Sequence, residues 1–246
     1  MNTYFTNFHL KLFCLFTLLF FPLSAFGQMF SIDDPQQRRE RPLGSLTILT
    51  AGWELGDYSY RGTGEPGDQL LDFNDSIFRL QLDSPGLDIS LAFGGAFTGM
   101  SDNSYLNVYG RLYNAFPLIR DSGMIIGLPI QITTDLKQVR RNDNDSEFQQ
   151  SSLVVGTGLY AAMRLNQRLN LIVRATPNYG FSFSQGNLFG GSLFRTDAKT
   201  HLLINNVFGE NALSIGYQFD YRAYRIEGDL NDYNFTSHLF TIGIGF

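Results

Sequence analysis

From Ser45 to the end of the chain, apolar residues recur at every second position in one segment after another. The last segment shows the pattern most clearly, with small or weakly polar residues between the apolar positions Phe240, Ile242, Ile244 and Phe246. A period of two is that of a β-strand with one apolar face and one slimmer or polar face. The pattern therefore predicts a chain that is built of strands and that ends inside one.

Short and long connections alternate between these segments. Four are short and have the composition of tight turns, at Asp83–Gly86, Arg120–Gly123, Leu165–Arg168 and Phe208–Asn211. Five are longer and polar, at about Gly56–Asp75, Thr98–Ser104, Lys137–Gln149, Phe181–Asp197 and Arg225–Asn234. The alternation predicts five hairpins and ten strands, with both chain ends on the short-turn side, as in an up-and-down barrel.

The first 27 residues differ from the rest of the chain. Lys11 precedes an apolar run at Leu12–Leu23, and small residues follow this run up to Gly27. This order is that of a secretory signal peptide, with cleavage expected near Gly27. A membrane-anchoring helix is the alternative, but the run is shorter than the roughly 20 residues that span a bilayer, and Pro22 interrupts its end. The predicted organisation is a signal peptide over 1–27, a flexible periplasmic segment over 28–44 and a barrel over 45–246.

Composition narrows the possible classes of function. Cys14 is the only cysteine and lies in the predicted signal peptide, so we expect no disulfide, thiol nucleophile or thiolate metal site in the mature chain. Without Lys11 the mature chain has 18 − 1 = 17 basic residues against 23 acidic ones, a net charge of −6, which argues against nucleic acid as a partner. We also expect no cofactor. We expect no metal site either, because the oxygen-rich Asn142–Glu147 lacks the glycine and closing glutamate of an EF-hand loop.

The second face of the predicted strands carries single charges in mid-strand. A soluble β-sandwich alternates in the same way, and its charges would face water. In a barrel these charges would face a lumen only slightly wider than side chains can fill, so we expect Arg–carboxylate pairs and a narrow or plugged interior. A conducting pore lined by the same residues is the alternative. The expected lumen charges are Glu54, Arg79, Asp88, Arg111, Asp135, Arg164, Arg174, Asp220 and Arg222.

Aromatic residues favour the barrel over the sandwich. They gather near the predicted strand ends, where the girdles of a membrane barrel meet the lipid headgroups, at Trp53, Tyr58, Phe97, Phe116, Tyr179, Phe181, Tyr221 and Tyr224. Together with the predicted signal peptide, the ten alternating strands and the terminal Phe246, this arrangement resembles the bacterial outer-membrane β-barrel family. The resemblance implies an all-β fold, namely an antiparallel up-and-down transmembrane barrel of about ten strands in the bacterial outer membrane.

The resemblance also implies partners. In that family the barrel-assembly machinery reads a last strand with a C-terminal aromatic residue, and the matching positions here are Phe240, Ile242, Ile244 and Phe246. Outer-membrane lipid and lipopolysaccharide would surround the barrel, with the anionic headgroups near Lys137, Arg140 and Arg141. A protein partner is a further interpretation of the outer loops, above all of Asn187–Phe194, and of the N-terminal segment with its charged run Gln37–Arg41.

Three alternative functions are consistent with these patterns. A structural, surface-interaction or complex-accessory barrel is the first and a small passive pore the second, and neither has a catalytic residue. The third is an outer-membrane hydrolase, because the family includes the omptin proteases and lipid A-modifying barrels that use Ser and His. For that function His201 is the candidate base and Ser237 the candidate nucleophile. Asp197 and Asp220 are the candidate orienting acids, whereas His238 lies on the apolar face and should point to lipid.

Overall fold

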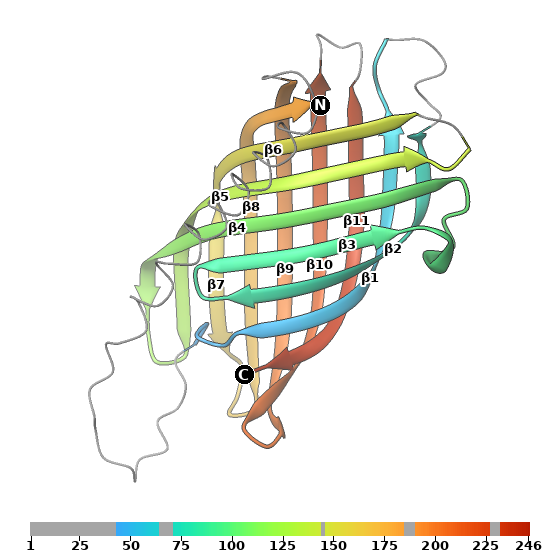
Figure 1. Cartoon of the computed structure of the whole chain (residues 1–246). Coiled ribbons are helices and arrows are strands. Elements are labelled where there is room, and N and C mark those ends of the chain that lie inside the picture. The colour runs from blue at the N-terminus through green and yellow to red at the C-terminus, as the bar shows by residue number, and fades with distance from the viewer. Residues whose placement is uncertain (1–42, 64–70, 144–145, 185–189, 227–231) are drawn as a thin grey trace, which may run out of the picture. The chain divides into compact units, whose positions relative to one another are not determined.

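The computed structural model of the chain describes residues 43–63, 71–143, 146–184, 190–226 and 232–246. A short 3-10 helix, η3 (Ala96–Thr98), follows the third strand. The strands are β1 (Ile48–Tyr60), β2 (Phe73–Ser84), β3 (Leu87–Gly94), β4 (Asn103–Arg120), β5 (Met124–Arg141), β6 (Glu147–Thr157), β7 (Leu159–Arg164), β8 (Leu169–Ser184), β9 (Gly191–Phe208), β10 (Asn211–Ile226) and β11 (Tyr233–Gly245), as Figure 1 shows. β6 and β7 are two parts of one strand, because both pair with β5 on one side and with β8 on the other.

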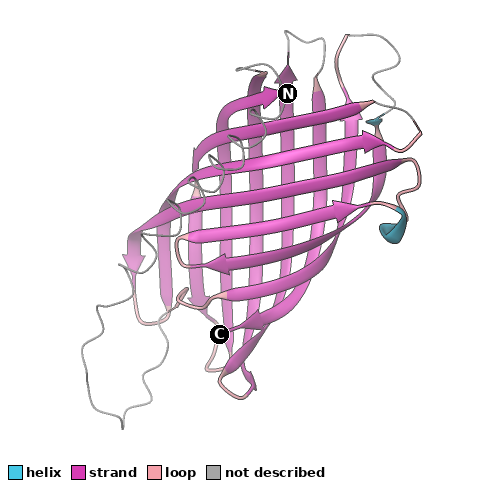
Figure 2. Cartoon of the chain, viewed as in Figure 1, coloured by secondary structure: helices cyan, strands magenta, loops and turns pink. Residues whose placement is uncertain are grey.

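These strands close into an antiparallel barrel of ten strands. Neighbours in the sequence are neighbours in the sheet, and β1 pairs with β11 over its whole length. In Figure 2 the front strands cross the rear ones at a steep angle, as expected for strands that tilt against the barrel axis. Followed from partner to partner around the sheet, Ile48 leads back to β1 at Tyr60, a stagger of 60 − 48 = 12 residues. The prediction of a ten-strand up-and-down barrel is confirmed.

The four predicted tight turns all connect strands at one end of the barrel. Two of them contain a glycine in the left-handed region, Gly86 with a φ of 87° and Gly209 with a φ of 66°. Glycine adopts this conformation without the steric cost that a Cβ atom would bring. The turn composition of these four segments therefore correctly predicted where the strands reverse.

At the opposite end the strands are longer than predicted. β5 continues to Arg141, and β9 already begins at Gly191, so most of the predicted loops Lys137–Gln149 and Phe181–Asp197 is strand. The physical reason is that the backbone ladder extends beyond the apolar belt. There both faces of a strand can be polar, and the hydrophobic alternation that identifies a strand in the sequence disappears.

The two faces of the barrel wall have opposite character. Large apolar side chains are exposed on the outside, and polar and charged side chains are buried inside. This inversion relative to a soluble protein is the pattern of a barrel whose outer face is covered by lipid. Exposed outward positions include Leu49, Leu91, Ile130, Val155, Ile215 and Ile242.

The aromatic residues predicted to form girdles divide between the two faces. Trp53 is 48% exposed and packs against Phe97 of η3 on the outside. Tyr58 and Tyr224 are both 0% exposed and lie inside the barrel, so the prediction that they meet lipid headgroups is wrong. A position near a strand end does not determine which face of the wall a side chain lies on. Side chains alternate between the inner and the outer face along a strand, so the face depends on the place of the residue in that alternation.

The predictions for the N-terminal part, a signal peptide over 1–27 and a periplasmic segment over 28–44, lie outside the described residues except for Leu43 and Gly44. Among the residues that the structure describes, no helix has the length and apolar character needed to cross a membrane.

Candidate functional site: a charged lumen between two apolar clusters

The inward positions of the strands bring together a dense set of charged side chains. Away from the long loops, the described, buried carboxylates are Glu54, Asp83, Asp88, Asp135, Asp197 and Asp220. The buried basic side chains are Arg79, Arg111, Arg174, Arg195, Arg222, Lys137 and Lys199. Ions inside a protein are strongly destabilising unless they are paired and hydrogen-bonded. The contacts of these side chains therefore decide whether the lumen is a solid core or a channel.

One set of contacts lies in the half of the lumen nearer the long loops. Arg79 Nη2 lies 2.6 Å from Glu54 Oε2. Arg222 bonds to Asp135 and, through Nη2 at 2.7 Å, to Asp220. The guanidinium of Arg195 meets the same Asp220 with two parallel hydrogen bonds, of 2.9 and 3.0 Å. Two-pronged Arg–carboxylate contacts of this kind are strong and geometrically specific.

A second set of contacts lies nearer the short turns. Arg111 Nη2 is 2.9 Å from Asp197 Oδ2, and Arg111 Nη1 is 3.4 Å from Asp88 Oδ2. Asp88 also bonds to Arg174, whose guanidinium lies over the ring of Tyr113 with 4.6 Å between the guanidinium carbon and the ring centroid. Within the described residues, each of these six carboxylates has at least one basic partner. This pairing compensates the negative charges of the lumen, whereas Lys137 has no carboxylate partner among the described contacts.

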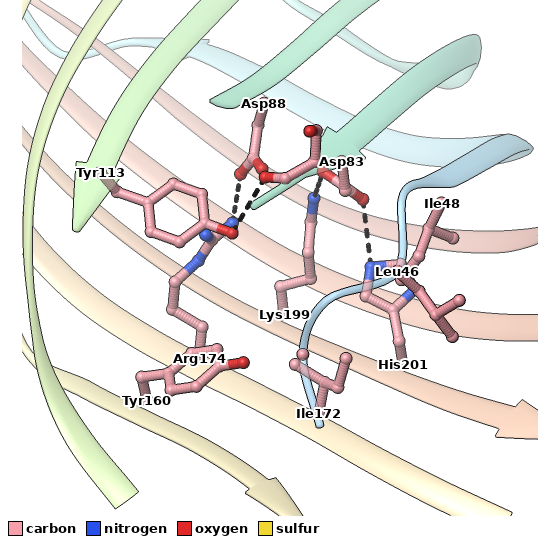
Figure 3. A pocket seen from close by; sticks show the side chains of 12 residues that line it. Leu46, Ile48, Asp83, Asp88, Tyr113, Tyr160, Ile172, Arg174, Lys199 and His201 are labelled. Carbon is pink, nitrogen blue, oxygen red and sulfur yellow. Dashed lines mark hydrogen bonds and ion pairs between the residues drawn. The ribbon is translucent and has the colours of Figure 1, made fainter. Parts of the chain in front are cut away.

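A small cavity of about 40 Å³ lies at the short-turn mouth of the lumen. Its polar wall includes Asp83, which is 2.5 Å from Lys199 Nζ and 3.2 Å from His201 Nε2 (Figure 3). Leu46 and Ile172 form part of its apolar wall. By volume the cavity could hold a few water molecules at about 10–15 Å³ each.

Apolar and aromatic clusters lie at both ends of the lumen. Nearer the long loops, Tyr58 stacks on Tyr233 with 4.7 Å between ring centroids, and Tyr105 stacks on Phe235 at 5.8 Å. Lys137 lies beneath these rings, with Nζ 3.3 Å from the Phe235 centroid. Nearer the short turns, a smaller cluster is formed by Leu46, Ile48, Ile172, Leu203 and Ala212.

Eight of the nine predicted lumen charges take part in the contacts described above. Arg164 lies apart from them, half-buried at the last position of β7 next to a turn. The remaining charges of the lumen were not predicted to face it. Lys137, Arg195 and Asp197 fell in segments predicted as loops, and Asp83 fell in a predicted turn.

The position of Lys137 corrects the predicted lipopolysaccharide contact. Lys137 is 0% exposed inside the barrel and cannot reach lipid headgroups, whereas Arg140 is exposed. The nearby Arg141 donates to Asp143 with Nε 2.7 Å from Oδ1, and this hydrogen bond lowers the pKa of the Asp143 carboxyl. Among the described residues, no group of acidic, His or Cys side chains is placed to hold a metal ion. Part of the loop Asn142–Glu147 lies outside the described residues.

The first three residues of the predicted partner loop Asn187–Phe194 fall outside the described residues. Its last residues, from Gly191 on, belong to β9, and Phe194 packs against Tyr221 on the outer wall. The charged run Gln37–Arg41 lies wholly outside the described residues.

His201 has different partners from those that the sequence suggested. It lies in the half of β9 nearer the short turns, and the hydroxyl next to it is that of Ser214, 3.1 Å from Nδ1. With Asp83 on the other ring nitrogen, the three side chains follow the order acid, imidazole, hydroxyl. Ser214 is 0% exposed and does not line the cavity, so a substrate in the cavity would not meet this hydroxyl.

The C-terminal residues lie where the barrel closes. Phe240, Ile242, Ile244 and Phe246 are between 44% and 62% exposed, on the outer face. The backbone N–H of Phe246 donates to the carbonyl oxygen of Thr47 at 2.9 Å, and the Thr47 N–H donates back at 3.0 Å. The final residue thus extends the seam between β1 and β11.

The architecture is that of bacterial outer-membrane β-barrels, with an apolar outer face, a polar interior and short turns at one end. No protein-family model and no curated protein matches the chain. The chain is similar in structure to the outer membrane protease OmpT from Escherichia coli, at 9% identity and a TM-score of 0.47, over 85% of this chain and 99% of OmpT.

Two other solved structures are less similar. Ail, the attachment invasion locus protein of Yersinia pestis, has 11% identity and a TM-score of 0.28, over 83% of this chain and 100% of Ail. The outer membrane channel DcaP of Acinetobacter baumannii has 8% identity and a TM-score of 0.24, over 82% of this chain and 96% of DcaP. The three proteins include a protease and a channel, and these distant likenesses carry no argument about activity.

Proposed function

We propose that this protein is a non-conducting, non-enzymatic barrel of the bacterial outer membrane, with a structural, surface-interaction or complex-accessory role. The observation that carries the proposal is the lumen filled by paired charges, of which Arg222, Arg79 and Arg111 are each at most 2% exposed. Such a core stiffens the barrel and leaves its outer wall and its rims as the surfaces on which partners can act.

Conductance in planar lipid bilayers tests the proposal. We expect no stable current steps from the wild-type barrel, because ions would have to displace paired charges and an aromatic cap. Stable current steps would contradict the proposal if their size changes in the double variant Asp135→Ala/Arg222→Ala. The matched lipid-facing variant Leu55→Ala should then leave the size of the steps unchanged. That result would instead identify the second alternative, a small pore lined by these charges.

The location in the outer membrane is tested by fractionation and gel mobility. A closed barrel should enter the outer-membrane fraction and migrate faster on an SDS gel before boiling than after, because it stays folded in the detergent. Recovery in the soluble periplasmic fraction, with no change of mobility on boiling, would contradict a membrane role.

A hydrolase is the second candidate, and the contact of His201 with Asp83 and Ser214 is the observation in its favour. It ranks second because the hydroxyl is buried away from the cavity. An esterase or protease activity that is lost in both His201→Ala and Ser214→Ala, in barrels that still show the mobility shift, would establish it.

A further inference from the structure

A histidine and a tyrosine form a polar pair on the lipid-facing side of the barrel wall. His238 of β11 is exposed, and its Nδ1 lies 2.8 Å from the hydroxyl of Tyr217 on β10. The surroundings are apolar, because His238 is the partner of Leu55 on β1 and of Phe219 on β10. Exposed ionisable side chains on a lipid-facing surface are costly and usually serve a function.

The register gives the depth of this pair relative to the edge of the apolar belt. One outward position further toward the long loops, β1 and β11 carry the paired residues Asp57 and Thr236. In the other direction the paired outward residues are apolar, beginning with Trp53 and Phe240. His238 therefore lies one outward position inside the belt, at the level where acyl chains meet headgroups.

The hydrogen bond between the two side chains leaves a donor for a ligand in either tautomer. If the Tyr217 hydroxyl donates to Nδ1, the proton on Nε2 is left to point outward. If Nδ1–H donates instead, the Tyr217 hydroxyl keeps its own proton for another acceptor. A donor exposed to hydrocarbon without a partner is unfavourable. At this depth the available acceptors are the phosphate and ester oxygens of lipids.

We propose that His238 and Tyr217 form a binding site for the phosphate group of an anionic outer-leaflet lipid. The aromatic side chains next to the pair, Phe240 at 58% exposure and Trp53 at 48%, provide an apolar surface along which the acyl chain of the same lipid can lie. A hydrogen bond is stronger when its acceptor is ionised, and the phosphate of an anionic lipid has no positive group of its own beside it, which favours an anionic over a zwitterionic headgroup. This inference rests on the proposed membrane location.

Trp53 is the only tryptophan of the chain and lies beside the proposed site, so its fluorescence can report which lipid occupies it. The barrel is reconstituted into phosphatidylcholine vesicles that contain either phosphatidic acid or phosphatidylcholine with brominated, quenching acyl chains. We expect phosphatidic acid to be enriched next to Trp53 by about two- to tenfold in the wild type, the factor that one or two hydrogen bonds provide. The enrichment should fall in Tyr217→Phe and disappear in His238→Leu.

Ile242→Ala is the matched control, because it changes a lipid-facing residue of β11 outside the site without removing a donor, and it should keep the enrichment. Equal enrichment in the wild type and in His238→Leu would overturn the proposal. Loss of the enrichment when inorganic phosphate is added would overturn it in favour of a site for the free anion.

The gel mobility of the same samples reports whether the barrel is folded. A folded wild-type barrel whose Trp53 is not quenched even by brominated phosphatidylcholine would mean that a second copy covers this wall, which also overturns the lipid site. Absence of the mobility shift would instead contradict the proposed function itself.

Discussion

Two buried cations of the lumen differ in what they contact. Arg222 is 0% exposed and bonds to both Asp135 and Asp220. Lys137 is equally buried, but Nζ has no hydrogen-bond acceptor among the described residues and lies against aromatic rings instead. Cation–π attraction offsets only a part of the desolvation of an ammonium group. The two residues should therefore contribute to stability with different sign.

Arg222→Ala should lower the free energy of unfolding by about 3–5 kcal/mol, because it leaves two buried carboxylates without this partner. Lys137→Met should leave the free energy of unfolding within about 1 kcal/mol of the wild type or raise it, since it removes an unpaired charge and keeps the volume filled. Urea unfolding of the barrel in lipid vesicles, followed by Trp53 fluorescence, measures both. The exposed Arg140→Ala serves as the control and should change stability by at most about 0.5 kcal/mol. Equal losses in the two lumen variants would contradict this distinction.

The residues that face the lumen could be predicted from the sequence, but the contacts that they form with one another could not. The alternation of apolar and polar residues along β3 and β8 places Asp88 and Arg174 on the inner face, and both are buried. Their contact joins residues 86 positions apart on β3 and β8, strands that are not neighbours in the sheet. Such a contact across the lumen depends on the stagger of the closed sheet, which no local pattern reveals.

At the scale of single elements, β4 extends past its neighbour β3. Their pairing ends at Leu87 and Leu112, and the next hydrogen bond runs from the Tyr113 N–H to the carbonyl oxygen of Gly86 in the turn before β3, at 3.0 Å. Beyond it, Asn114–Arg120 pairs only with β5 within the described part of the chain, and Leu118 is 70% exposed. Because backbone groups alternate in direction along a strand, the nitrogen of Pro117 faces the open edge like that of Tyr113. Proline has no N–H to offer there, which discourages pairing with another chain.

Pro117→Val should therefore increase self-association of the barrel. The substitution restores a donor on an apolar open edge and raises its β-propensity. Size-exclusion chromatography with light scattering in detergent measures the oligomeric state. Ala115→Val is the matched control, because it raises the β-propensity of the same edge while Pro117 stays in place, and it should remain monomeric. If both variants stay monomeric up to the highest soluble concentration, the edge is not protected by the proline.

Element boundaries were predictable only where the apolar belt or a turn marks them. At the short-turn end, Asp83–Gly86 and Phe208–Asn211 located the reversals, because glycine and polar turn residues have a direct conformational role. At the other end β5 runs on through Lys137 to Arg141 without an apolar face. The strand there is stabilised by its neighbours rather than by its own sequence pattern, so the strand end predicted from the sequence comes too early.

At the scale of the whole molecule, the last residue contributes to closure in two separable ways. Its backbone forms two hydrogen bonds with Thr47 across the seam. Its side chain, 52% exposed on the outer face, makes no comparable contribution to the seam and matches the aromatic terminus that the resemblance links to assembly in cells. Phe246→Ala removes the side chain only, whereas deletion of residue 246 removes the backbone bonds as well.

The two changes should therefore separate assembly from stability. Phe246→Ala should fold spontaneously into lipid vesicles almost as fully as the wild type, because the seam keeps its hydrogen bonds, but it should accumulate in the outer membrane of cells at a clearly lower level. Deletion of residue 246 should lower both yields, since each lost backbone hydrogen bond contributes roughly 0.5–1.5 kcal/mol. The fraction of barrel with fast gel mobility, measured in vesicles and in cell envelopes, gives both quantities. Ile130→Ala, a lipid-facing change on β5 away from the terminus, controls for loss of apolar surface. If Phe246→Ala lowers the yield in vesicles as much as in cells, the side chain acts on the stability of the barrel itself and not as a signal to the assembly machinery.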